Sequence, residues 1–319
     1  MRIFSGIQPT GELHIGNYLG AIKQWIELQD NNECIFCIVD LHALTSPFDP
    51  KKMKELTMEK AMIYLASGVD PKKSVIFIQS KVSQHSELAW LLNTITPLGD
   101  LYRMTQYKEK SKKFIKNLNA GLLNYPILMA SDILLYQTEA VPVGKDQKQH
   151  VELARTIARK FNNKFGETFK VPESRLPKMG AKIMSLTEPA KKMSKSDKPD
   201  SRIGMFDSPK EIEKKIMKAV TDTGKEVKYD PLKKPGVSNL LAIYSIFSNT
   251  PLEKLEFSSY KELKAELSSL LISSLSPFRE KKESLKTKAI EEILLEGEEK
   301  GRAIAKQTML KVRENMGLF

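Results

Sequence analysis

The first 80 residues alternate between two kinds of segment. Short, apolar, β-rich runs, typical of strands buried on both faces of a parallel sheet, occupy residues 2–7, 34–40 and 74–80. Between them lie 17–30 and 51–68, whose apolar residues recur at helical spacing. Because strands and helices alternate in this order, the sequence predicts an α/β fold with a doubly wound, Rossmann-like parallel sheet.

This alternation continues and then stops. We expect an apolar helix interrupted near Pro126 over 121–137, a strand over 140–144 and a helix over 145–165. After about residue 205 the apolar segments all have a helical period, with Ser or Pro at the helix starts. The sequence therefore predicts a Rossmann-like domain at 1–205 and a second, all-helical domain at 206–319, whose last helix packs back on the first.

Polar segments follow the first two expected strands, "QPTG" at 8–11 and "DLHALT" at 40–45. In doubly wound sheets, ligands bind beyond the carboxyl ends of the strands. Within "PTGELHIGN" (9–17), Gly11 and Gly16 come just before a helix, whose unpaired N–H groups attract phosphate. An ordinary turn between a strand and a helix explains these glycines equally well, so both interpretations stay open at this point.

The formal net charge is +12, which favours a polyanionic partner such as nucleic acid, although a solvated lysine-rich surface has the same charge. The excess lies mainly in the first two-thirds, because the chain from Asp200 onward has 22 basic and 19 acidic residues. Six cations and one acid lie between Arg103 and Lys116. Since few apolar residues fix this stretch in a core, we expect a mobile loop that orders on ligand binding.

Composition narrows the class of protein. Hydrophobic residues make up 41% of the chain, enough for a folded core, and no apolar run reaches the ~20 residues of a membrane span. The first residues lack the apolar core of a signal peptide, so we expect a soluble, cytoplasmic protein. Cys34 and Cys37 match a zinc or redox spacing, but there is no second pair. Their place in a strand, facing opposite ways, favours two buried small side chains.

A second motif is "KKMSKSDK" (191–198), with four lysines and two serines in a short segment. Such a donor-rich loop suits an oxyanion such as pyrophosphate, and alone it is equally typical of an exposed basic loop. Together with the glycine turn, it resembles the two signatures of class I aminoacyl-tRNA synthetases. His-Ile-Gly-His stands here as His14–Asn17, with asparagine at the last position, and Lys-Met-Ser-Lys-Ser is unaltered at 192–196.

Further stretches are similar to bacterial tryptophanyl-tRNA synthetases over most of the chain, most weakly after residue 250. They are "FSGIQPTG" (4–11), "FCIVDLHALT" (36–45), "MTQYKEKS" (104–111), "AGLLNYPILMASDILLY" (120–136), "VPVGKDQKQHVELAR" (141–155), "KIMSLTEPAKKMSKSD" (182–197) and "KPGVSNLLAIYS" (234–245). The resemblance implies activation of L-tryptophan with ATP, release of pyrophosphate, and transfer of tryptophan to the 3′ end of tRNA(Trp). It makes 1–205 the catalytic domain and 206–319 the anticodon-binding domain.

The resemblance also implies the residues of the nucleotide site. The ATP-binding residues would be Gln8, Pro9, Thr10, Gly16, Asn17, Gly144, Lys145, Asp146, Ile183, Lys192, Met193, Ser194, Lys195 and Ser196. Of the expected catalytic residues, His14 would donate to a phosphate oxygen, Lys192 and Lys195 would hold pyrophosphate, and Lys110 would close over the phosphates. Mg²⁺ is expected to bind through the phosphates of ATP, with no metal site on the protein.

For the amino acid, the pivotal residue is Asp132, because a carboxylate inside "ILMASDILLY" is costly to bury without a partner. An N-cap or a paired core acid is the alternative role. The resemblance implies that Asp132 accepts the indole N–H and rejects phenylalanine, which has no such donor. The other expected tryptophan-binding residues are Phe4, Gly6, Gln8, His42, Tyr125, Met129, Val141, Val143 and Gln147, supported by His150; no role for His85 emerges.

Three other functions stay open on the sequence. A tyrosyl-tRNA synthetase has the same fold and reaction but usually shows Gly-Gly-Ser-Asp-Gln where this chain has "VPVGKDQ". A nucleotidyltransferase of the same superfamily rarely has so long a helical C-terminal part, and a non-catalytic RNA-binding relative would not need Asp132 or an intact 192–196 motif. The family also implies a homodimer, for which the residue pattern gives no sign of its own.

Overall fold

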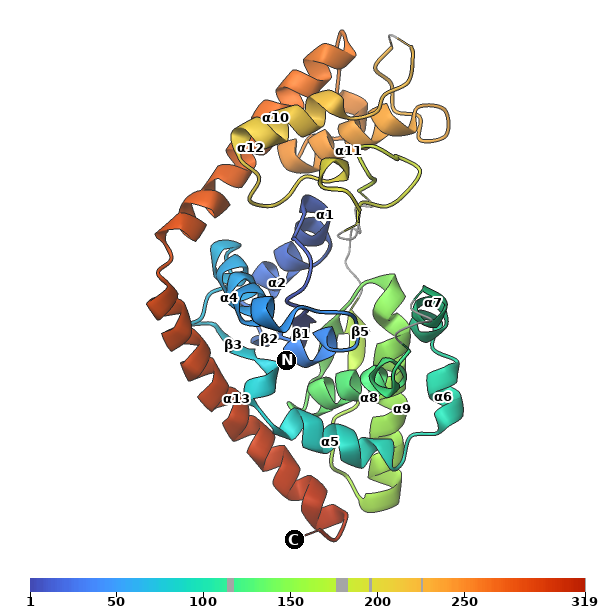
Figure 1. The fold of residues 1–319 in the computed structure, drawn as a ribbon, viewed down its shortest axis with the longest axis vertical. Helices are drawn as coiled ribbons and strands as arrows, with labels where there is room; N and C mark the ends of the chain where they lie inside the picture. Colours follow the sequence, from blue (N-terminus) through green and yellow to red (C-terminus); the bar gives the residue numbers. More distant parts are fainter. Residues whose placement is uncertain (114–117, 176–182, 195–196, 225, 319) are drawn as a thin grey trace. The chain divides into compact units, whose positions relative to one another are not determined.

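The computed structural model describes residues 1–113, 118–175, 183–194, 197–224 and 226–318 (Figure 1). They form two compact units, each discontinuous in sequence. The first unit comprises Met1–Thr10, Gln24–Lys178 and Leu285–Phe319, and the second comprises Gly11–Lys23 and Met179–Ser284. A single boundary near residue 205 does not describe this division, because Gly11–Lys23 folds together with Met179–Ser284, whereas the last helix belongs to the first unit.

A five-stranded sheet, in the order β3-β2-β1-β4-β5 and parallel throughout, forms the centre of the first unit. Its strands are β1 (Arg2–Ile7), β2 (Glu33–Ile38), β3 (Ser74–Ile78), β4 (Ala140–Pro142) and β5 (Glu173–Arg175). In the register, Ile3 of β1 faces Cys34 on one side and Ala140 on the other. The chain builds outward from β1 first to one side and then to the other, so the predicted doubly wound, Rossmann-like sheet is confirmed.

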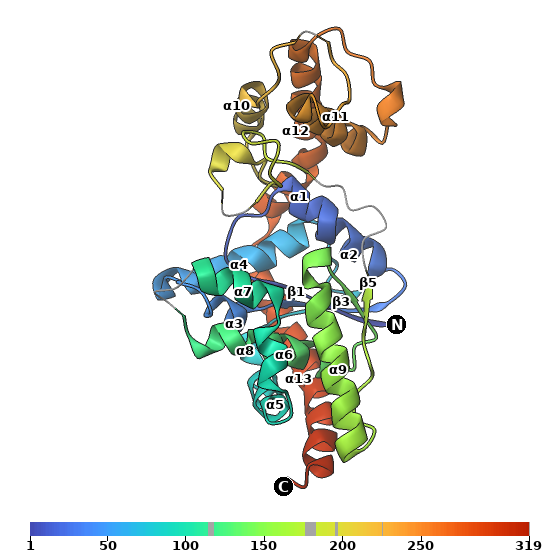
Figure 2. The same ribbon diagram turned by 90° about the vertical axis from the view of Figure 1, so that its right-hand side faces the viewer.

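Helices cover both faces of this sheet (Figure 2). The helices and short helical turns of the first unit are α2 (Lys23–Leu28, from its second residue), α3 (Asp40–Ala43), α4 (Pro50–Ala66), η2 (Gln79–Lys81), α5 (Gln84–Asn93), α6 (Leu98–Tyr102), α7 (Thr105–Lys113), α8 (Ala120–Leu134), η4 (Lys145–Gln147), α9 (Lys148–Phe165) and α13 (Thr287–Asn315). On one face, Trp25 and Tyr64 pack around Phe36 of β2, with ring centroids 5.5 and 6.2 Å from it.

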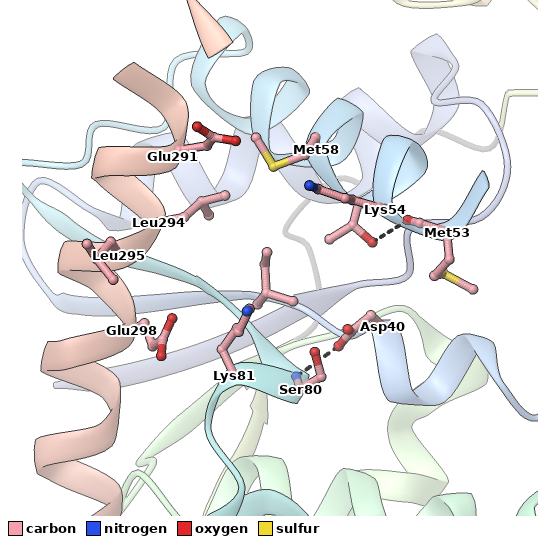
Figure 3. Close-up of a pocket in the computed structure, with 12 residues that line it drawn as sticks. Asp40, Met53, Lys54, Met58, Ser80, Lys81, Glu291, Leu294, Leu295 and Glu298 are labelled. Atoms are coloured by element: carbon pink, nitrogen blue, oxygen red, sulfur yellow. Dashed lines mark hydrogen bonds between the residues drawn. The ribbon is translucent and has the colours of Figure 1, made fainter. Parts of the chain in front are cut away.

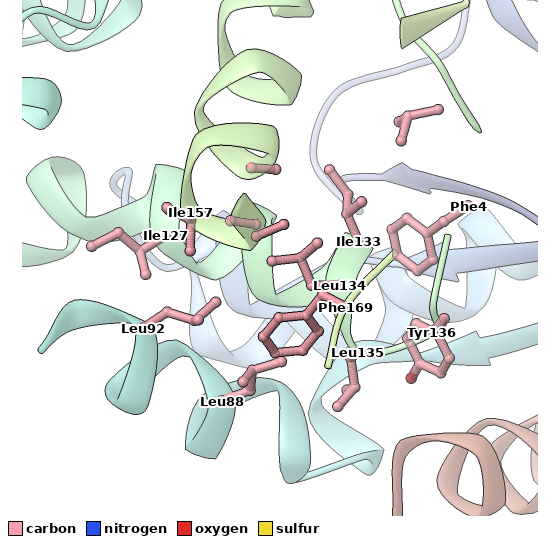
Figure 4. Packing of buried hydrophobic residues seen from close by; sticks show 14 of the residues in the cluster. Phe4, Leu88, Leu92, Ile127, Ile133, Leu134, Leu135, Tyr136, Ile157 and Phe169 are labelled. Atoms are coloured by element: carbon pink, nitrogen blue, oxygen red, sulfur yellow. The ribbon is translucent and has the colours of Figure 1, made fainter. Parts of the chain in front are cut away.

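The other face of the sheet carries the main hydrophobic core, formed with α5, α8 and α9 (Figure 4). Phe4 of β1 stacks on Tyr136 there, with ring centroids 5.6 Å apart and planes 8° from parallel. Cys37 lies in this core as well, and Cys34 is also buried; both thiols are free. Burial raises the pKa of Cys34 to about 11 and holds the pKa of Cys37 well above its ordinary value, so both thiols stay protonated, as small core side chains do.

Two local expectations are wrong. The apolar helix is not interrupted: α8 is continuous through Pro126. The proline removes one backbone hydrogen bond, and the buried side chains on both sides of it hold the helix in the core. The basic stretch is not a loop at 105–113, where the chain forms α7. Lysine, glutamine and glutamate are good helix formers even where no core fixes them. The last part of that stretch, 114–117, lies outside the described residues.

The last long helix, α13, packs along β3 at the edge of the sheet (Figure 1). Gly297 makes this approach possible, because a Cβ at that position would lie 1.9 Å from the backbone oxygen of Ile76. A Cβ on Gly301, one turn later, would lie 3.3 Å from the ring of Phe77. Two glycines on one face of the helix therefore bring its backbone against the strand.

The longer elements of the second unit are the helices α10 (Pro209–Lys218), α11 (Pro235–Ser248) and α12 (Tyr260–Ser284). Its short helical elements are α1 (Ile15–Asn17), the π-helical turn η1 (Tyr18–Ile22), η5 (Pro199–Ser201) and η6 (Leu252–Lys254). Ser208 and Glu211 form a capping box at the start of α10. Helix α12 packs against α10 and α11. Across the described residues of both units, no helix is long and apolar enough to cross a membrane.

Candidate active site

The first signature motif forms a helix cap in the second unit. His14 is the N-cap of α1, and its Nδ1 accepts from the N–H of Gly16 at 3.1 Å. In return, Asn17 Oδ1 accepts from the N–H of His14 at 3.2 Å. Asparagine at the last position of the motif therefore closes a reciprocal capping box, a role the sequence did not predict. Because Nδ1 is an acceptor, the imidazole proton of neutral His14 lies on Nε2, where it can be donated.

Gly16 is restricted by the same cap. A Cβ on Gly16 would lie 3.0 Å from two atoms of the His14 ring. Any side chain there would push against the imidazole and disturb the cap. Glycine at this position is consistent with the expected approach of a nucleotide to the backbone, and it is already needed for the local fold.

The segment after the second motif pairs with the first motif. Ile15 N donates to Ile203 O at 3.0 Å, and Met205 N donates to Leu13 O at 2.9 Å. Between the motifs, the buried Arg202 donates to a carboxylate oxygen of Glu12 at 2.8 Å and to the carbonyl of Asp197. Both motifs thus belong to one backbone framework inside the second unit.

The start of the second motif lies on a two-stranded pairing. Met193 N donates to Ile183 O at 3.0 Å, and Ser185 N donates to Lys191 O at 2.9 Å. Asn239 of α11 bonds both the N–H and the carbonyl of Met184 at 2.9 Å each. Lys192 is exposed. Lys195 and Ser196, the two final residues of the motif, lie outside the described residues.

Replacing Arg202 with methionine is expected to lower the free energy of unfolding by about 1–3 kcal/mol, because its charge-assisted hydrogen bonds are lost from a buried position. Thermal unfolding of the purified protein measures this. Glu12→Gln serves as the control: its side chain is 69% exposed and keeps an acceptor for Arg202, so it should change little. If Arg202→Met were as stable as the wild type, the hydrogen bonds of Arg202 to Glu12 and Asp197 would not stabilise the second unit.

The remaining expected ATP residues lie in the first unit at the carboxyl edge of the sheet. Gln8, Pro9 and Thr10 follow β1, and the exposed Gly144 and Asp146 follow β4. A Cβ on Gly144 would lie 2.7 Å from a carboxylate oxygen of Asp146, whose exposed side chain can move away. Lys145 is the first residue of the turn η4, and Lys110 belongs to α7. The side chains of these two lysines lie outside the described part of the structure.

Gly6 marks an opening at the same edge. It is exposed although β1 is the central strand of the sheet, and its neighbours Ser5 and Ile7 are buried. A Cβ on Gly6 would lie 2.8 Å from a methyl of Val39. The backbone of the central strand is therefore accessible near its carboxyl end, where sheets of this type bind their ligands.

Asp132 is the centre of a buried hydrogen-bonded cluster, and it is 1% exposed. Its Oδ1 accepts from Gln79 Nε2 at 2.6 Å and from His85 Nδ1 at 2.6 Å. Its Oδ2 accepts from His42 Nε2 at 2.7 Å. Burial by itself would raise the pKa of Asp132, but the charges and hydrogen bonds of His42 and His85 outweigh it and hold the pKa well below its ordinary range. Asp132 is thus a paired, ionised acid inside the first unit, not an N-cap.

A second buried group adjoins the cluster. The Tyr125 hydroxyl lies 2.8 Å from His150 Nε2 and 3.2 Å from Gln106 Oε1. The Tyr125 ring meets His42 edge-on, with centroids 6.3 Å apart. Burial raises the pKa of Tyr125, so the phenol stays neutral. Tyr125 and His150 therefore lie together with His42 in the first unit.

The expected apolar walls have two different environments. Phe4, Val141 and Val143 are buried within the main hydrophobic core, and Met129 packs against it while partly exposed. Gln147 is exposed at the end of η4. Phe4, Val141 and Val143 are thus core residues in the structure. Their contact with a bound amino acid stays a prediction.

Sequence reasoning missed Gln79, His85 and Tyr136. Gln79 directly follows β3, so the rule that singled out the residues after β1 and β2 applied to it too. Tyr136 is four residues beyond Asp132, a spacing that places both on one side of a helix end. His85 carried no local signal, because only the packing of α5 against α8 brings it to Asp132.

A cavity of about 580 Å³ lies elsewhere in the first unit, between α4, α13 and the turn after β3 (Figure 3). Met53 and Met58 from α4 and Leu294 and Leu295 from α13 line it, together with Lys54, Lys81, Asp40, Ser80, Glu291 and Glu298. None of the expected site residues does. Among the described residues, no three His, Cys, Asp or Glu side chains are grouped as metal ligands.

The order of the sheet and the helix cap at 14–17 define a Rossmann-like α/β protein with the fold and first motif of the class I synthetase superfamily. The family model described as tRNA synthetases class I (W and Y) matches residues 1–276, and the chain belongs to this family. It is an aminoacyl-tRNA synthetase, as the resemblance of the two motifs indicated.

Individual relatives cover the whole chain. A protein of Caldanaerobacter subterraneus subsp. tengcongensis named tryptophan–tRNA ligase is 52% identical, over 100% of this chain and 98% of its own length. The tryptophanyl-tRNA synthetase of Campylobacter jejuni, solved as a complex with ADP and tryptophan, is 39% identical over 100% of both chains, with a TM-score of 0.86. That of Mycoplasma pneumoniae is 35% identical over 100% of this chain and 98% of that one, with a TM-score of 0.88.

Proposed function

We propose that the chain is a tryptophan–tRNA ligase. It activates L-tryptophan with ATP to form tryptophanyl-adenylate and pyrophosphate, and it transfers the tryptophanyl group to the 3′ end of tRNA(Trp). Family membership and relatives of about 50% identity that are named for this reaction support the proposal. The observation that carries it is Asp132, an ionised carboxylate with three protein donors and capacity for about one more.

In this proposal, the fourth donor to Asp132 is the indole N–H of tryptophan. A carboxylate accepts such an N–H in a charge-assisted hydrogen bond, which is stronger than a neutral one. Tyr125 and Gln147 hold the α-amino group, and the exposed backbone at Gly6 and the partly exposed Met129 border the amino acid. Together with Met129, the core residues Phe4, Val141 and Val143 form the apolar walls around the amino acid.

The nucleotide part of the proposal rests on both motifs. His14 Nε2 donates to a phosphate oxygen, Lys192 and Lys195 stabilise the charge that develops on pyrophosphate, and Lys110 closes over the phosphates from α7. Gln8, Pro9, Thr10, Gly16, Gly144, Lys145, Asp146 and Ile183 bind the nucleoside, and Mg²⁺ binds through the phosphates of ATP. Positioning and charge stabilisation provide most of the catalysis in such transfers.

The proposal extends to the partners and the location of the protein. The residues after 205 that form α10, α11 and α12 bind the anticodon arm, and the basic first part of the chain contacts the tRNA backbone. The enzyme acts as a homodimer in the cytoplasm, where tRNA is charged. The family resemblance carries both of these last statements.

Pyrophosphate exchange with each amino acid tests the proposal, followed by charging of purified tRNA. Tryptophan should support exchange, and tyrosine should not, because the relatives of about 50% identity are tryptophan enzymes by name. Exchange with tyrosine alone would establish the alternative tyrosyl enzyme. Exchange without charging of any tRNA would favour a nucleotidyltransferase, and no exchange at all would favour an RNA-binding protein.

Lys195→Ala is expected to lower the kcat of adenylate formation by about 100-fold and to change the KM for ATP little. A contact made mainly with the developing pyrophosphate acts in the transition state and not in the ground state. Exchange rates at several ATP concentrations separate the two constants. Lys198→Ala, an exposed lysine just past the motif, is the matched control. A raised KM with unchanged kcat would contradict this role of Lys195.

A further inference from the structure

Beside Asp132 lies a chain of hydrogen bonds that the proposed reaction does not use directly. Tyr136, just past the end of α8, lies with its hydroxyl 2.8 Å from His85 Nε2, and His85 Nδ1 lies 2.6 Å from Asp132 Oδ1. All three side chains are buried, His85 and Tyr136 with no exposed surface at all. The end of one helix therefore supplies both termini of the chain, with the imidazole of α5 between them.

The backbone of His85 is held as firmly as its ring. Ser131, the residue before Asp132, donates its hydroxyl to the carbonyl of His85 at 2.7 Å. The His85 ring also packs against Phe77 and Tyr136, with centroids 5.9 and 5.4 Å away. The imidazole has no room to turn, so its two nitrogens keep their partners.

The positions of the protons follow from the chemistry of the partners. A carboxylate only accepts, so His85 Nδ1 carries a proton and donates it to Asp132. The Tyr136 hydroxyl pairs with the other nitrogen in either state of the ring: it donates to Nε2 of a neutral imidazole and accepts from Nε2 of a charged one. Burial raises the pKa of Tyr136 well above its ordinary value, so this phenol keeps its proton. In both states the N–H on Nδ1 points toward the carboxylate.

The two oxygens of Asp132 face different surroundings. Oδ1 is bonded to Gln79 and His85, both with no exposed surface. Oδ2 is bonded to His42, which is 6% exposed, lies in α3 at the carboxyl edge of the sheet and meets Tyr125 edge-on. Of about four acceptor sites on a carboxylate, three are used, and the remaining one is on Oδ2. The inner oxygen is fixed in the core, and the outer one faces the expected amino acid residues.

We propose that His85, oriented by Tyr136, is a positioning residue for tryptophan selection: it fixes the inner oxygen of the ionised Asp132 so that the outer oxygen meets the indole N–H. This rests on the proposed function, in which Asp132 accepts that N–H. Without His85 only Gln79 and His42 restrain the rotation of the carboxylate about its last bond, so the direction of its open acceptor site is less well fixed. Preorganised acceptors contribute specificity because no reorganisation accompanies binding.

The test uses two amino acids of the same shape. In 3-benzothienylalanine a sulfur atom replaces the indole N–H of tryptophan, so the ratio of kcat/KM for the two in pyrophosphate exchange reports the hydrogen bond to Asp132. Tyr136→Phe should raise the KM for tryptophan about fivefold and lower this ratio by a similar factor, with the KM for ATP unchanged. His85→Leu should lower the ratio more than tenfold.

Two further variants make the test specific. Tyr64→Phe is the matched control, because Tyr64 is fully buried in the same unit and its hydroxyl has no hydrogen-bond partner among the described residues. His85→Asn keeps an N–H donor near the position of Nδ1 and should recover most of the ratio that His85→Leu loses. A purely structural role for His85 predicts lower thermal stability in both variants with an unchanged ratio.

The outcomes separate this inference from the proposed function. If Asp132→Asn lowers the ratio while Tyr136→Phe, His85→Leu and His85→Asn leave it at the wild-type value, the positioning role is wrong and the indole contact stands. If Asp132→Asn also leaves the ratio unchanged, Asp132 is a core acid, and both are wrong. Should Tyr136→Phe fail to fold, the comparison of His85→Asn with His85→Leu decides the inference by itself.

Discussion

Asp132→Asn is expected to lower the preference for tryptophan over 3-benzothienylalanine by about 10- to 100-fold. Asparagine keeps an oxygen for Gln79 and His85, and its amide can donate to His42 once that imidazole changes tautomer. The group facing the indole N–H then changes from an acceptor to a donor. Loss of a hydrogen bond to a charged group costs about 1.5–3 kcal/mol, which corresponds to the expected change of about 10- to 100-fold in the preference.

Pyrophosphate exchange at several concentrations of tryptophan, 3-benzothienylalanine, tyrosine and phenylalanine measures this. Alanine is the less informative replacement, because it leaves Gln79, His42 and His85 buried without their common acceptor. Asp40→Asn is a control, since this carboxylate lies outside the Asp132 cluster and accepts from the backbone N–H groups of Leu41 and Ser80, which an asparagine oxygen can also do. An unchanged ratio in Asp132→Asn would show that the acid serves the core alone.

The structure also lowers the expected rejection of phenylalanine. From the sequence alone, bound phenylalanine would leave the carboxylate of Asp132 buried and unpaired. Sites of this kind discriminate against the analogue without the donor by a very large factor in kcat/KM. In the structure three protein donors already hold the carboxylate, so phenylalanine leaves one acceptor site empty and not a bare charge. The smaller size of the phenyl ring adds to the discrimination through lost packing.

Gly297→Ala is expected to lower the free energy of unfolding of the first unit by about 2–3 kcal/mol. The added Cβ would lie 1.9 Å from the carbonyl oxygen of Ile76, less than any real contact, and this oxygen belongs to the backbone of β3. The strand cannot yield without disturbing its pairing with β2, so α13 must move outward and lose packing. Better helix propensity returns only about 1 kcal/mol.

Thermal and denaturant unfolding measure the effect. Gly99→Ala in α6 is the control, because a Cβ there meets nothing within 4 Å, and it should be neutral or stabilising by up to about 1 kcal/mol. If Gly297→Ala were as stable as the wild type, α13 would not pack along β3 as described. Gly301→Ala should fall between the two, since its added Cβ would lie 3.3 Å from the side chain of Phe77 and not against backbone.

The sequence by itself determined the sheet, the family and the existence of a special buried acid. Strands buried on both faces are apolar throughout, so β1, β2 and β3 could be recognised from short local runs. Each of the two motifs, at 14–17 and at 192–196, is an uninterrupted run of residues that can be found by reading the sequence. Asp132 can be found in the same way, because a charged residue inside an apolar helix needs a partner. Each of these signals is local in the chain.

Only the tertiary structure decided what Asp132 is bonded to and how the chain divides. Gln79, His42 and His85 are 53, 90 and 47 residues away from it, so no local pattern could reveal that they share one carboxylate. The same holds for the two units, since Gly11–Lys23 joins Met179–Ser284 through pairing such as Ile15 with Ile203, while α13 returns to β3. Contacts of this kind depend on packing between distant segments, which residue periodicity does not encode.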